Sequence, residues 1–152
     1  QNPFKPETGL LRDSDRLDLV RAAVYDDFKI EASDIEFHLP RPSYTIHTLV
    51  HLTEKYPDRE FKVIVGEDNL TNFVKWKIYE RILENYGLYV YPRAGAQPSE
   101  LKSHPNVKFV DAPVLDISAT FIRKCIRNRK SVRYLVPDSV EEIIRSRGYY
   151  LS

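Results

Sequence analysis

Three short apolar runs typical of β-strands alternate with helical patterns along this chain. The runs lie at residues 61–65, 88–91 and 107–110. The helical patterns lie over residues 44–55 and 77–85 and from Ser118 onward. Alternating strands and helices imply an α/β fold with a parallel sheet, because parallel strands need a crossover that a helix supplies. In such sheets, ligands bind beyond the C-terminal ends of the strands.

Helix boundaries follow from capping residues and from the spacing of apolar side chains. A helix is predicted over residues 13–24, and Ser43 is the predicted cap of the helix over 44–55. Two short extended stretches are predicted between these helices, at 28–30 and 35–39. We expect the second helix to bury an apolar stripe formed by Ile46, Leu49 and Val50.

The last third of the chain holds two more amphipathic helices. Ser118 is the predicted N-cap of the first, whose apolar face is expected to be Phe121, Ile122, Cys125 and Ile126. Asp138, followed by Glu141 three residues later, is the predicted N-cap of the second. Gly148 closes that helix as its C′ residue.

The composition is that of an ordinary globular domain. Of the 152 residues, 42% are hydrophobic and 30% are charged, and the net charge is +1. Cys125 is the only cysteine, so no internal disulfide can form, and a reducing cytoplasmic compartment fits best. No apolar run approaches the length of a membrane span, so we expect no membrane partner.

The segment Ile117–Arg123 carries the strongest chemical signal. With Ser118 at the N-cap, the first backbone N–H groups of the helix point outward, and Thr120 and Arg123 lie beside them. Free N–H donors and the positive end of the helix dipole both favour an anion. The segment therefore predicts a site for nucleotide phosphates.

Gly66 and Asp68 directly follow the strand at 61–65. In one interpretation a ligand approaches the backbone at Gly66 while Asp68 accepts hydrogen bonds from ribose hydroxyls. In the other, the segment is an ordinary strand-to-helix turn with Asp68 as its N-cap. Spacing alone favours the turn, and a short helix is expected to begin near Asp68.

Two aromatic positions also have two interpretations each. Trp76, the only tryptophan, can stack on a flat heteroaromatic ring, although a packing role is the commoner case. The segment Ser43-Tyr44-Thr45 can hold a small carboxylate or amide on its backbone N–H groups. Equally, it can be a plain helix start with Tyr44 in the core.

The remaining polar clusters give weaker signals. His47 and His51 have a spacing that can bind a metal, but no third ligand is evident, and we predict no metal held by the protein. Six cations between Arg123 and Arg133 can bind a triphosphate, contact nucleic acid or form a solvated basic face. No stacking aromatic pattern accompanies them, which disfavours nucleic acid.

Taken together, the motifs resemble one family, the bacterial nicotinate mononucleotide adenylyltransferases. The matching segments are Pro3-Phe4-Lys5, the helix that contains Arg16, Ser43-Tyr44-Thr45 with Thr48-Leu49, Gly66-Glu67-Asp68-Asn69 with Trp76, and Ile117–Arg123. The last segment is typical of the nucleotidyltransferase superfamily, and its combination with Ser43-Tyr44-Thr45 and Trp76 indicates the pyridine mononucleotide branch. The resemblance extends through residues 132–151 and covers essentially the whole chain.

The resemblance implies an enzyme of NAD biosynthesis. Such an enzyme transfers the adenylyl group of ATP to nicotinate mononucleotide, with Mg²⁺ on the phosphates, and releases nicotinate adenine dinucleotide and pyrophosphate. Catalysis in this family rests mainly on positioning and charge stabilisation. By resemblance, Ser118 and Arg123 are the catalytic residues that hold the ATP phosphates, Thr120 belongs to the same substrate-binding motif, and Lys5 reaches phosphate.

The resemblance also implies which residues hold the nucleosides. Gly66 and Asp68 contact the ribose region of the nucleotide. Tyr44 and Thr45 hold the nicotinate carboxylate, mainly through backbone N–H groups, and Trp76 stacks on the nicotinate ring.

The chain departs from the family in one respect. The family's glycine-rich first loop and its HxGH-type histidine motif do not occur, and the chain, which contains no methionine, begins at Gln1. We therefore expect one Rossmann-like domain over residues 1–152, a doubly wound parallel sheet with helices on both faces that lacks its first strand–helix unit. Activity is expected of the parent protein rather than of these residues alone.

Three alternatives stay open. The chain can be a non-catalytic nucleotide-binding module or an inactive fragment. It can also be another nucleotidyltransferase, such as a pantetheine-phosphate or cytidine transferase, although Trp76 and Ser43-Tyr44-Thr45 argue against this. Finally, it can bind nucleic acid through its basic run. The sequence leaves open a homo-oligomer and does not set the preference between nicotinate and nicotinamide.

Overall fold

A computed structural model describes residues 11–151 and divides them into two compact units. The first, which we call the sheet unit, comprises residues 38–116. The second, the helical unit, comprises residues 11–37 and 117–151. Each unit has its own cluster of buried apolar side chains, so each is described separately below.

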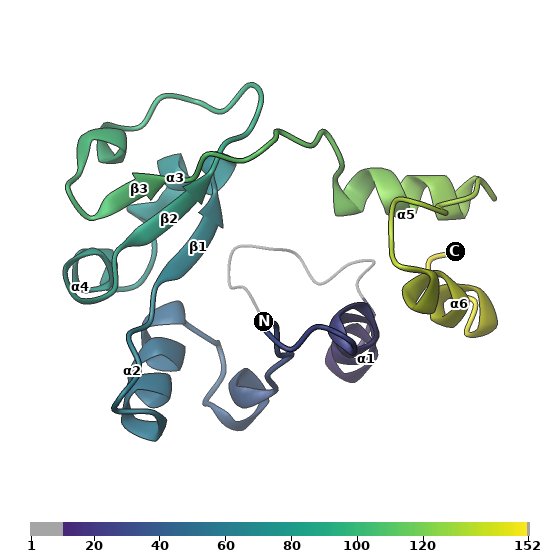
Figure 1. Ribbon diagram of the computed structural model, residues 1–152, viewed down its shortest axis with the longest axis horizontal. Coiled ribbons are helices and arrows are strands. Elements are labelled where there is room, and N and C mark those ends of the chain that lie inside the picture. The colour runs from purple at the N-terminus through teal and green to yellow at the C-terminus, as the bar shows by residue number, and fades with distance from the viewer. Residues whose placement is uncertain (1–10, 152) are drawn as a thin grey trace. The chain divides into compact units, whose positions relative to one another are not determined.

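The sheet unit contains three parallel strands in the order β1-β2-β3 (Figure 1). They are β1 (Val63–Gly66), β2 (Leu88–Tyr91) and β3 (Val107–Phe109). In the register, Val65 lies opposite Val90, and Val90 lies opposite Phe109. The expected α/β fold with a parallel sheet is confirmed.

One face of this sheet forms the core of the unit. Side chains alternate between faces along a strand, so residues aligned across the register share a face. The buried ones are Val65, Leu88, Val90 and Val107. Ile64 alternates to the other face, where 77% of it is exposed.

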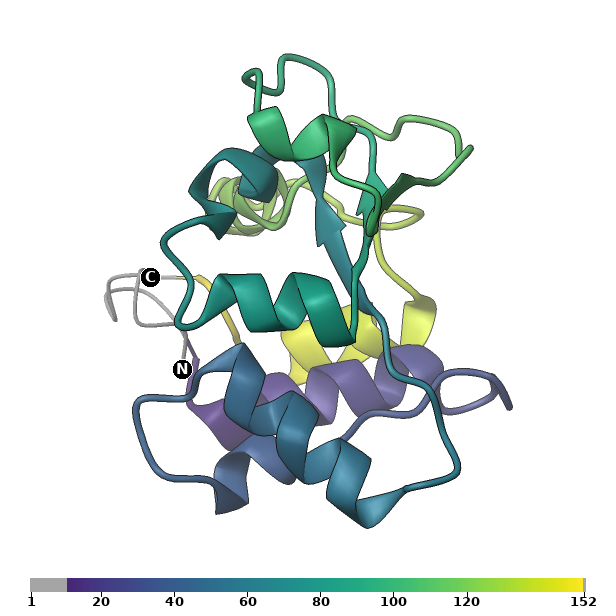
Figure 2. The ribbon, with the colours of Figure 1, turned by 90° about the vertical axis from the view of Figure 1, so that its left-hand side faces the viewer.

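Three helices and a short 3₁₀ turn accompany the strands. They are α2 (Thr45–Lys55), α3 (Glu67–Phe73), α4 (Tyr79–Asn85) and η2 (Glu100–Ser103). α2 and α4 pack beside each other, as Figure 2 shows. Each helix contributes to the core, through Ile46 and Leu49, Leu70 and Phe73, and Ile82 and Leu83 respectively.

The helical unit contains α1 (Asp13–Val24), α5 (Ala119–Arg127) and α6 (Asp138–Ser146). α1 packs against α6, and the Ser139 hydroxyl donates to the Ala22 carbonyl at 2.8 Å. The buried residues of this unit are Cys125, Ile126, Val132, Val140 and Ile144. Cys125 is therefore a small core residue, as its position on the helix predicts.

Gly148 ends α6 in the predicted way. Its φ is +63°, a left-handed conformation that glycine adopts without steric cost. The Gly148 N–H donates to the Arg145 carbonyl and the Tyr149 N–H donates to the Ile144 carbonyl. These two bonds form a Schellman motif, which turns the chain sharply after the helix.

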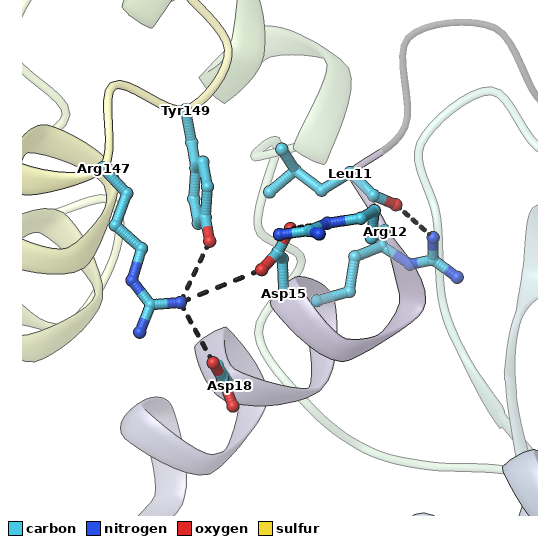
Figure 3. Close-up of polar contacts among 7 residues, drawn as sticks. Leu11, Arg12, Asp15, Asp18, Arg147 and Tyr149 are labelled. Carbon is cyan, nitrogen blue, oxygen red and sulfur yellow. Dashed lines mark hydrogen bonds and ion pairs between the residues drawn. The ribbon is translucent and has the colours of Figure 1, made fainter.

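The residues that follow α6 are tied to α1 by ion pairs (Figure 3). The guanidinium of Arg147 lies 3.0 Å from a carboxylate oxygen of Asp18 and 3.9 Å from one of Asp15. Arg12 lies 3.0 Å from the other oxygen of the buried Asp15. The hydrogen bonds from Arg12 and Tyr149 hold the pKa of Asp15 below its usual range.

Several local predictions were wrong. The stretch predicted as extended at 35–39 contains a 3₁₀ helix, η1 (Ile35–His38), and no strand forms at 28–30. The N-cap of α2 is Tyr44 rather than Ser43. The N-cap of α6 is Pro137. Asp138 instead lies in the first turn, where its negative charge interacts favourably with the helix dipole.

Two apolar stripes are also narrower than predicted. Val50 on α2 is 44% exposed, and Phe121 on α5 is 50% exposed. Both residues lie at the margin of the stripe, where a helical angle alone does not determine burial.

Candidate functional site

The N-terminus of α5 has the predicted cap. The hydroxyl of Ser118 accepts a hydrogen bond from the Phe121 N–H at 3.1 Å, and the Ser118 backbone is extended. The N–H groups at the very start of α5 have no earlier helical carbonyl to bond. They can therefore donate to an anion, which the helix dipole also favours.

Arg123 lies one turn further along α5 and is oriented by a local contact. Its guanidinium donates to the Thr120 hydroxyl at 3.3 Å. Ser118, Thr120 and Arg123 thus lie together on the first two turns of one helix. The predicted phosphate-binding residues of this segment form a single group.

Tyr150 is an addition to this region that sequence reasoning missed. Burial raises the pKa of its hydroxyl, while the nearby positive charges of Arg123 and Arg16 act to lower it. The Arg16 guanidinium itself donates to the Leu11 carbonyl and pairs with Asp13. No local signal in the sequence indicates that residues 16, 123 and 150 approach one another.

In the sheet unit, Gly66 ends β1 and is the N-cap of α3. A Cβ atom at this position would lie 2.4 Å from Oδ1 of Asp68, closer than real Cβ contacts allow. A side chain at residue 66 would therefore displace the exposed Asp68 carboxylate, whereas the backbone itself does not require glycine, because φ at Gly66 is an ordinary −73°. Asp68 is in the first turn of α3 and not at its cap, which corrects the alternative that made it an N-cap.

Glu67, which lies between Gly66 and Asp68 in the sequence, is buried. One carboxylate oxygen accepts the Arg93 backbone N–H at 3.1 Å, and the other lies 2.6 Å from the Lys102 ammonium. These two hydrogen bonds, with Lys102 the larger effect, hold the pKa of Glu67 below its usual range. Sequence reasoning assigned Glu67 no role.

Arg93 follows β2 and reaches the same end of the sheet. Its Nε lies 3.9 Å from the Asp68 carboxylate, and its Nη1 donates to the Leu115 carbonyl at 3.3 Å. The Tyr91 hydroxyl donates to the Pro113 carbonyl and accepts from the Leu115 N–H at 3.2 Å. The C-terminal strand ends are therefore lined by a carboxylate and a guanidinium.

Tyr44 and Trp76 both pack on the core of the sheet unit. Both are partly buried, and the indole of Trp76 lies 4.9 Å from the ring of Phe73. Tyr44 precedes Thr45, the first residue of α2, and the ammonium of Lys77 lies 4.5 Å from its ring centroid. The contact with Lys77 brings the start of α2 next to the segment that carries Trp76.

The predicted site residues therefore form two groups, one in each unit. The sheet unit holds Gly66, Asp68, Tyr44, Thr45 and Trp76. The helical unit holds Ser118, Thr120 and Arg123. Lys5 lies outside the described residues.

Comparison with known proteins decides the family. The family model described as Cytidylyltransferase-like matches residues 1–125. A Cytophaga hutchinsonii protein named "Probable nicotinate-nucleotide adenylyltransferase" is 53% identical over 99% of this chain and 78% of its own length. A Flavobacterium johnsoniae protein of the same name is 51% identical over 98% of this chain and 78% of its own length.

The chain belongs to the nicotinate-nucleotide adenylyltransferase family. The resemblance read from its motifs is thereby confirmed.

Solved structures agree with this adenylyltransferase fold. Plasmodium falciparum nicotinic acid mononucleotide adenylyltransferase complexed with APC superposes with a TM-score of 0.74 at 19% identity, over 93% of this chain and 77% of that one. The same enzyme complexed with NaAD gives a TM-score of 0.74 at 18% identity, over 96% and 78%. At these identities the likeness concerns the fold, and it confirms the Rossmann-like α/β class.

Metal ligands and membrane-spanning segments are the remaining features of this adenylyltransferase chain. Among residues 11–151, no three His, Cys, Asp or Glu side chains gather closely enough to hold a metal ion. His47, one of the pair with metal-like spacing, makes an edge-on contact with the ring of Tyr44. Within the same described range, no helix has the length and apolar character needed to cross a bilayer.

Proposed function

We propose that the protein transfers the adenylyl group of ATP to nicotinate mononucleotide, producing nicotinate adenine dinucleotide and pyrophosphate. A phosphate oxygen of the mononucleotide attacks the α-phosphorus of ATP. The bond from that phosphorus to the bridging oxygen of the β-phosphate breaks, and pyrophosphate leaves. The mononucleotide phosphate is itself the nucleophile, so no covalent enzyme intermediate is required.

The observation that carries this proposal is the α5 N-terminus. Its outward N–H donors, the Ser118 cap and Arg123 provide positive potential where a polyphosphate needs it. Negative charge grows on the leaving pyrophosphate as the bond breaks. We propose that Ser118 and Arg123 stabilise that charge and that Thr120, which accepts from Arg123, sets the direction of the guanidinium.

The residues of the sheet unit are assigned to the nucleosides. Asp68 is exposed enough to accept hydrogen bonds from ribose hydroxyls, and Gly66 leaves room for its carboxylate. The backbone N–H groups at the start of α2, at Tyr44 and Thr45, can hold the nicotinate carboxylate. Trp76 offers a ring face for stacking on the pyridine. For Lys5, a contact with phosphate stays a prediction from the resemblance.

The proposal includes Mg²⁺. Mg²⁺ keeps several waters and is commonly bound through substrate phosphates with one or two carboxylates. We therefore assign the ion to the phosphates of ATP. When bound, the ion neutralises phosphate charge.

The proposed partners are thus small molecules, ATP and nicotinate mononucleotide. Cytoplasmic location is part of the proposal, because the single thiol, Cys125, is buried and no internal disulfide can form.

A comparison of acceptors tests the proposal. The purified native protein is incubated with ATP, Mg²⁺ and one acceptor at a time: nicotinate mononucleotide, nicotinamide mononucleotide or phosphopantetheine. Nicotinate mononucleotide is expected to give the highest kcat/KM for pyrophosphate release. A higher value with phosphopantetheine, or with CTP replacing ATP, would assign the protein to another branch of the superfamily.

A further inference from the structure

Glu67 joins three segments that are distant in the sequence. It begins α3, directly after β1. Its Oε2 accepts the backbone N–H of Arg93, which follows β2, at 3.1 Å. Its Oε1 lies 2.6 Å from the ammonium of Lys102, in η2. One carboxylate therefore ties the start of α3 to two points of the loop between β2 and β3.

The environment of Glu67 keeps it charged. Only 7% of the residue is exposed, and a buried carboxylate is stable only when it is paired and hydrogen-bonded. Both oxygens have a partner, which matches the lowered pKa. Lys102 is placed by a second contact, because its ammonium lies 5.4 Å from the centroid of the Phe109 ring on β3.

The hydrogen bond from the Arg93 N–H to Glu67, which we call the tether, fixes the position of the Arg93 backbone. With its peptide N–H held by Glu67, the Arg93 guanidinium reaches the Asp68 carboxylate at 3.9 Å and the Leu115 carbonyl at 3.3 Å. Within residues 11–151, Arg93 is the one cation that pairs with Asp68, and 61% of the Asp68 side chain is exposed. Arg93 therefore links the two carboxylates: its backbone N–H bonds Glu67 and its guanidinium lies near Asp68.

We propose that Glu67 is a positioning residue for nucleotide binding, which acts by holding the Arg93 backbone so that the Arg93 guanidinium orients Asp68. This inference rests on the proposed function, because it uses the assignment of Asp68 to a ribose. It predicts that Glu67 influences substrate affinity through Asp68 rather than the chemical step.

A double-mutant cycle tests the proposal. Kinetic constants for both substrates are measured for Glu67→Ala, Asp68→Ala and the double variant. Both single variants are expected to raise the KM of the same substrate, each about tenfold, with kcat within about threefold. The KM of the double variant should not exceed that of the single variant with the higher KM, because both changes remove the same interaction.

Conservative variants sharpen the test. Glu67→Gln keeps an oxygen that can accept the Arg93 N–H, so it should restore most of the affinity that Glu67→Ala loses. Glu84→Gln, on the exposed face of α4, is the matched control and should leave both KM values unchanged. Additive effects of Glu67→Ala and Asp68→Ala, or changes in kcat alone, would overturn the proposal.

Amide hydrogen exchange gives a readout that is independent of activity. In Glu67→Ala, exchange of the peptide around residues 92–96 should accelerate, while Glu67→Gln should retain most of the protection. Unchanged exchange in Glu67→Ala would overturn the tether. If the wild-type protein releases no pyrophosphate, the proposed function fails, and this exchange result still decides whether Glu67 holds Arg93.

Discussion

The Asp68 carboxylate folds back over Gly66. A Cβ atom at residue 66 would lie only 2.4 Å from Oδ1 of Asp68, so the two atoms would need the same space. In Gly66→Ala, Asp68 must therefore swing away. Because 61% of its side chain is exposed, it can do so with a stability change below about 1 kcal/mol. The KM of the nucleotide that Asp68 contacts should rise about tenfold. Steady-state kinetics and urea unfolding of the same variant separate the two effects, and a large loss of stability with unchanged KM would contradict this account.

Arg123 is expected to act on the phosphates of ATP. Arg123→Ala should lower kcat/KM for ATP by about 30- to 1,000-fold, equivalent to about 2–4 kcal/mol of transition-state stabilisation. Arg145→Ala, an exposed cation on α6, is the control and should change kcat/KM by less than about twofold. Equal effects of the two variants would mean that Arg123 contributes only general positive charge.

Trp76 is expected to act on the mononucleotide. Trp76→Ala should raise the KM for nicotinate mononucleotide by about 5- to 150-fold, since stacking of one ring contributes about 1–3 kcal/mol. The KM for ATP should stay within about twofold. Trp76→Phe keeps a ring face next to Phe73 and should recover part of the affinity. An effect confined to ATP would exclude the stacking role.

The Asp15 ion pairs predict a pH dependence of stability. The folded pKa of Asp15 is lowered, so its contribution is complete above the unfolded pKa of about 3.9 and is lost as the pH falls through the folded value. Asp15→Asn should therefore lower the Tm by several degrees at pH 7 and by much less at pH 2.5. Thermal unfolding at both pH values checks this. An equal Tm difference at both would show that packing, not charge, explains the loss.

Local signals predicted the elements that depend on neighbouring residues. The bounds of α1 and β2 match those predicted, and Ser118 caps α5 as expected. The same is true of Gly148, whose positive φ is required by the turn after α6. In each case, the physical cause lies within a few residues of the feature.

Tertiary contacts decided the features that were missed. Glu67 and Arg93 are 26 residues apart, and nothing near either residue indicates their hydrogen bond. Residues 35–38 are apolar enough for a strand, but a strand needs a partner, and they form a 3₁₀ turn instead. For the site, the residue types were predictable, whereas the tether that orients Asp68 was not.

The most direct test of the central claim is product analysis of the native protein with ATP, Mg²⁺ and nicotinate mononucleotide. The account predicts that pyrophosphate and nicotinate adenine dinucleotide form in equal amounts and only when both substrates are present. Absence of the dinucleotide, or pyrophosphate release that does not depend on the mononucleotide, would contradict it.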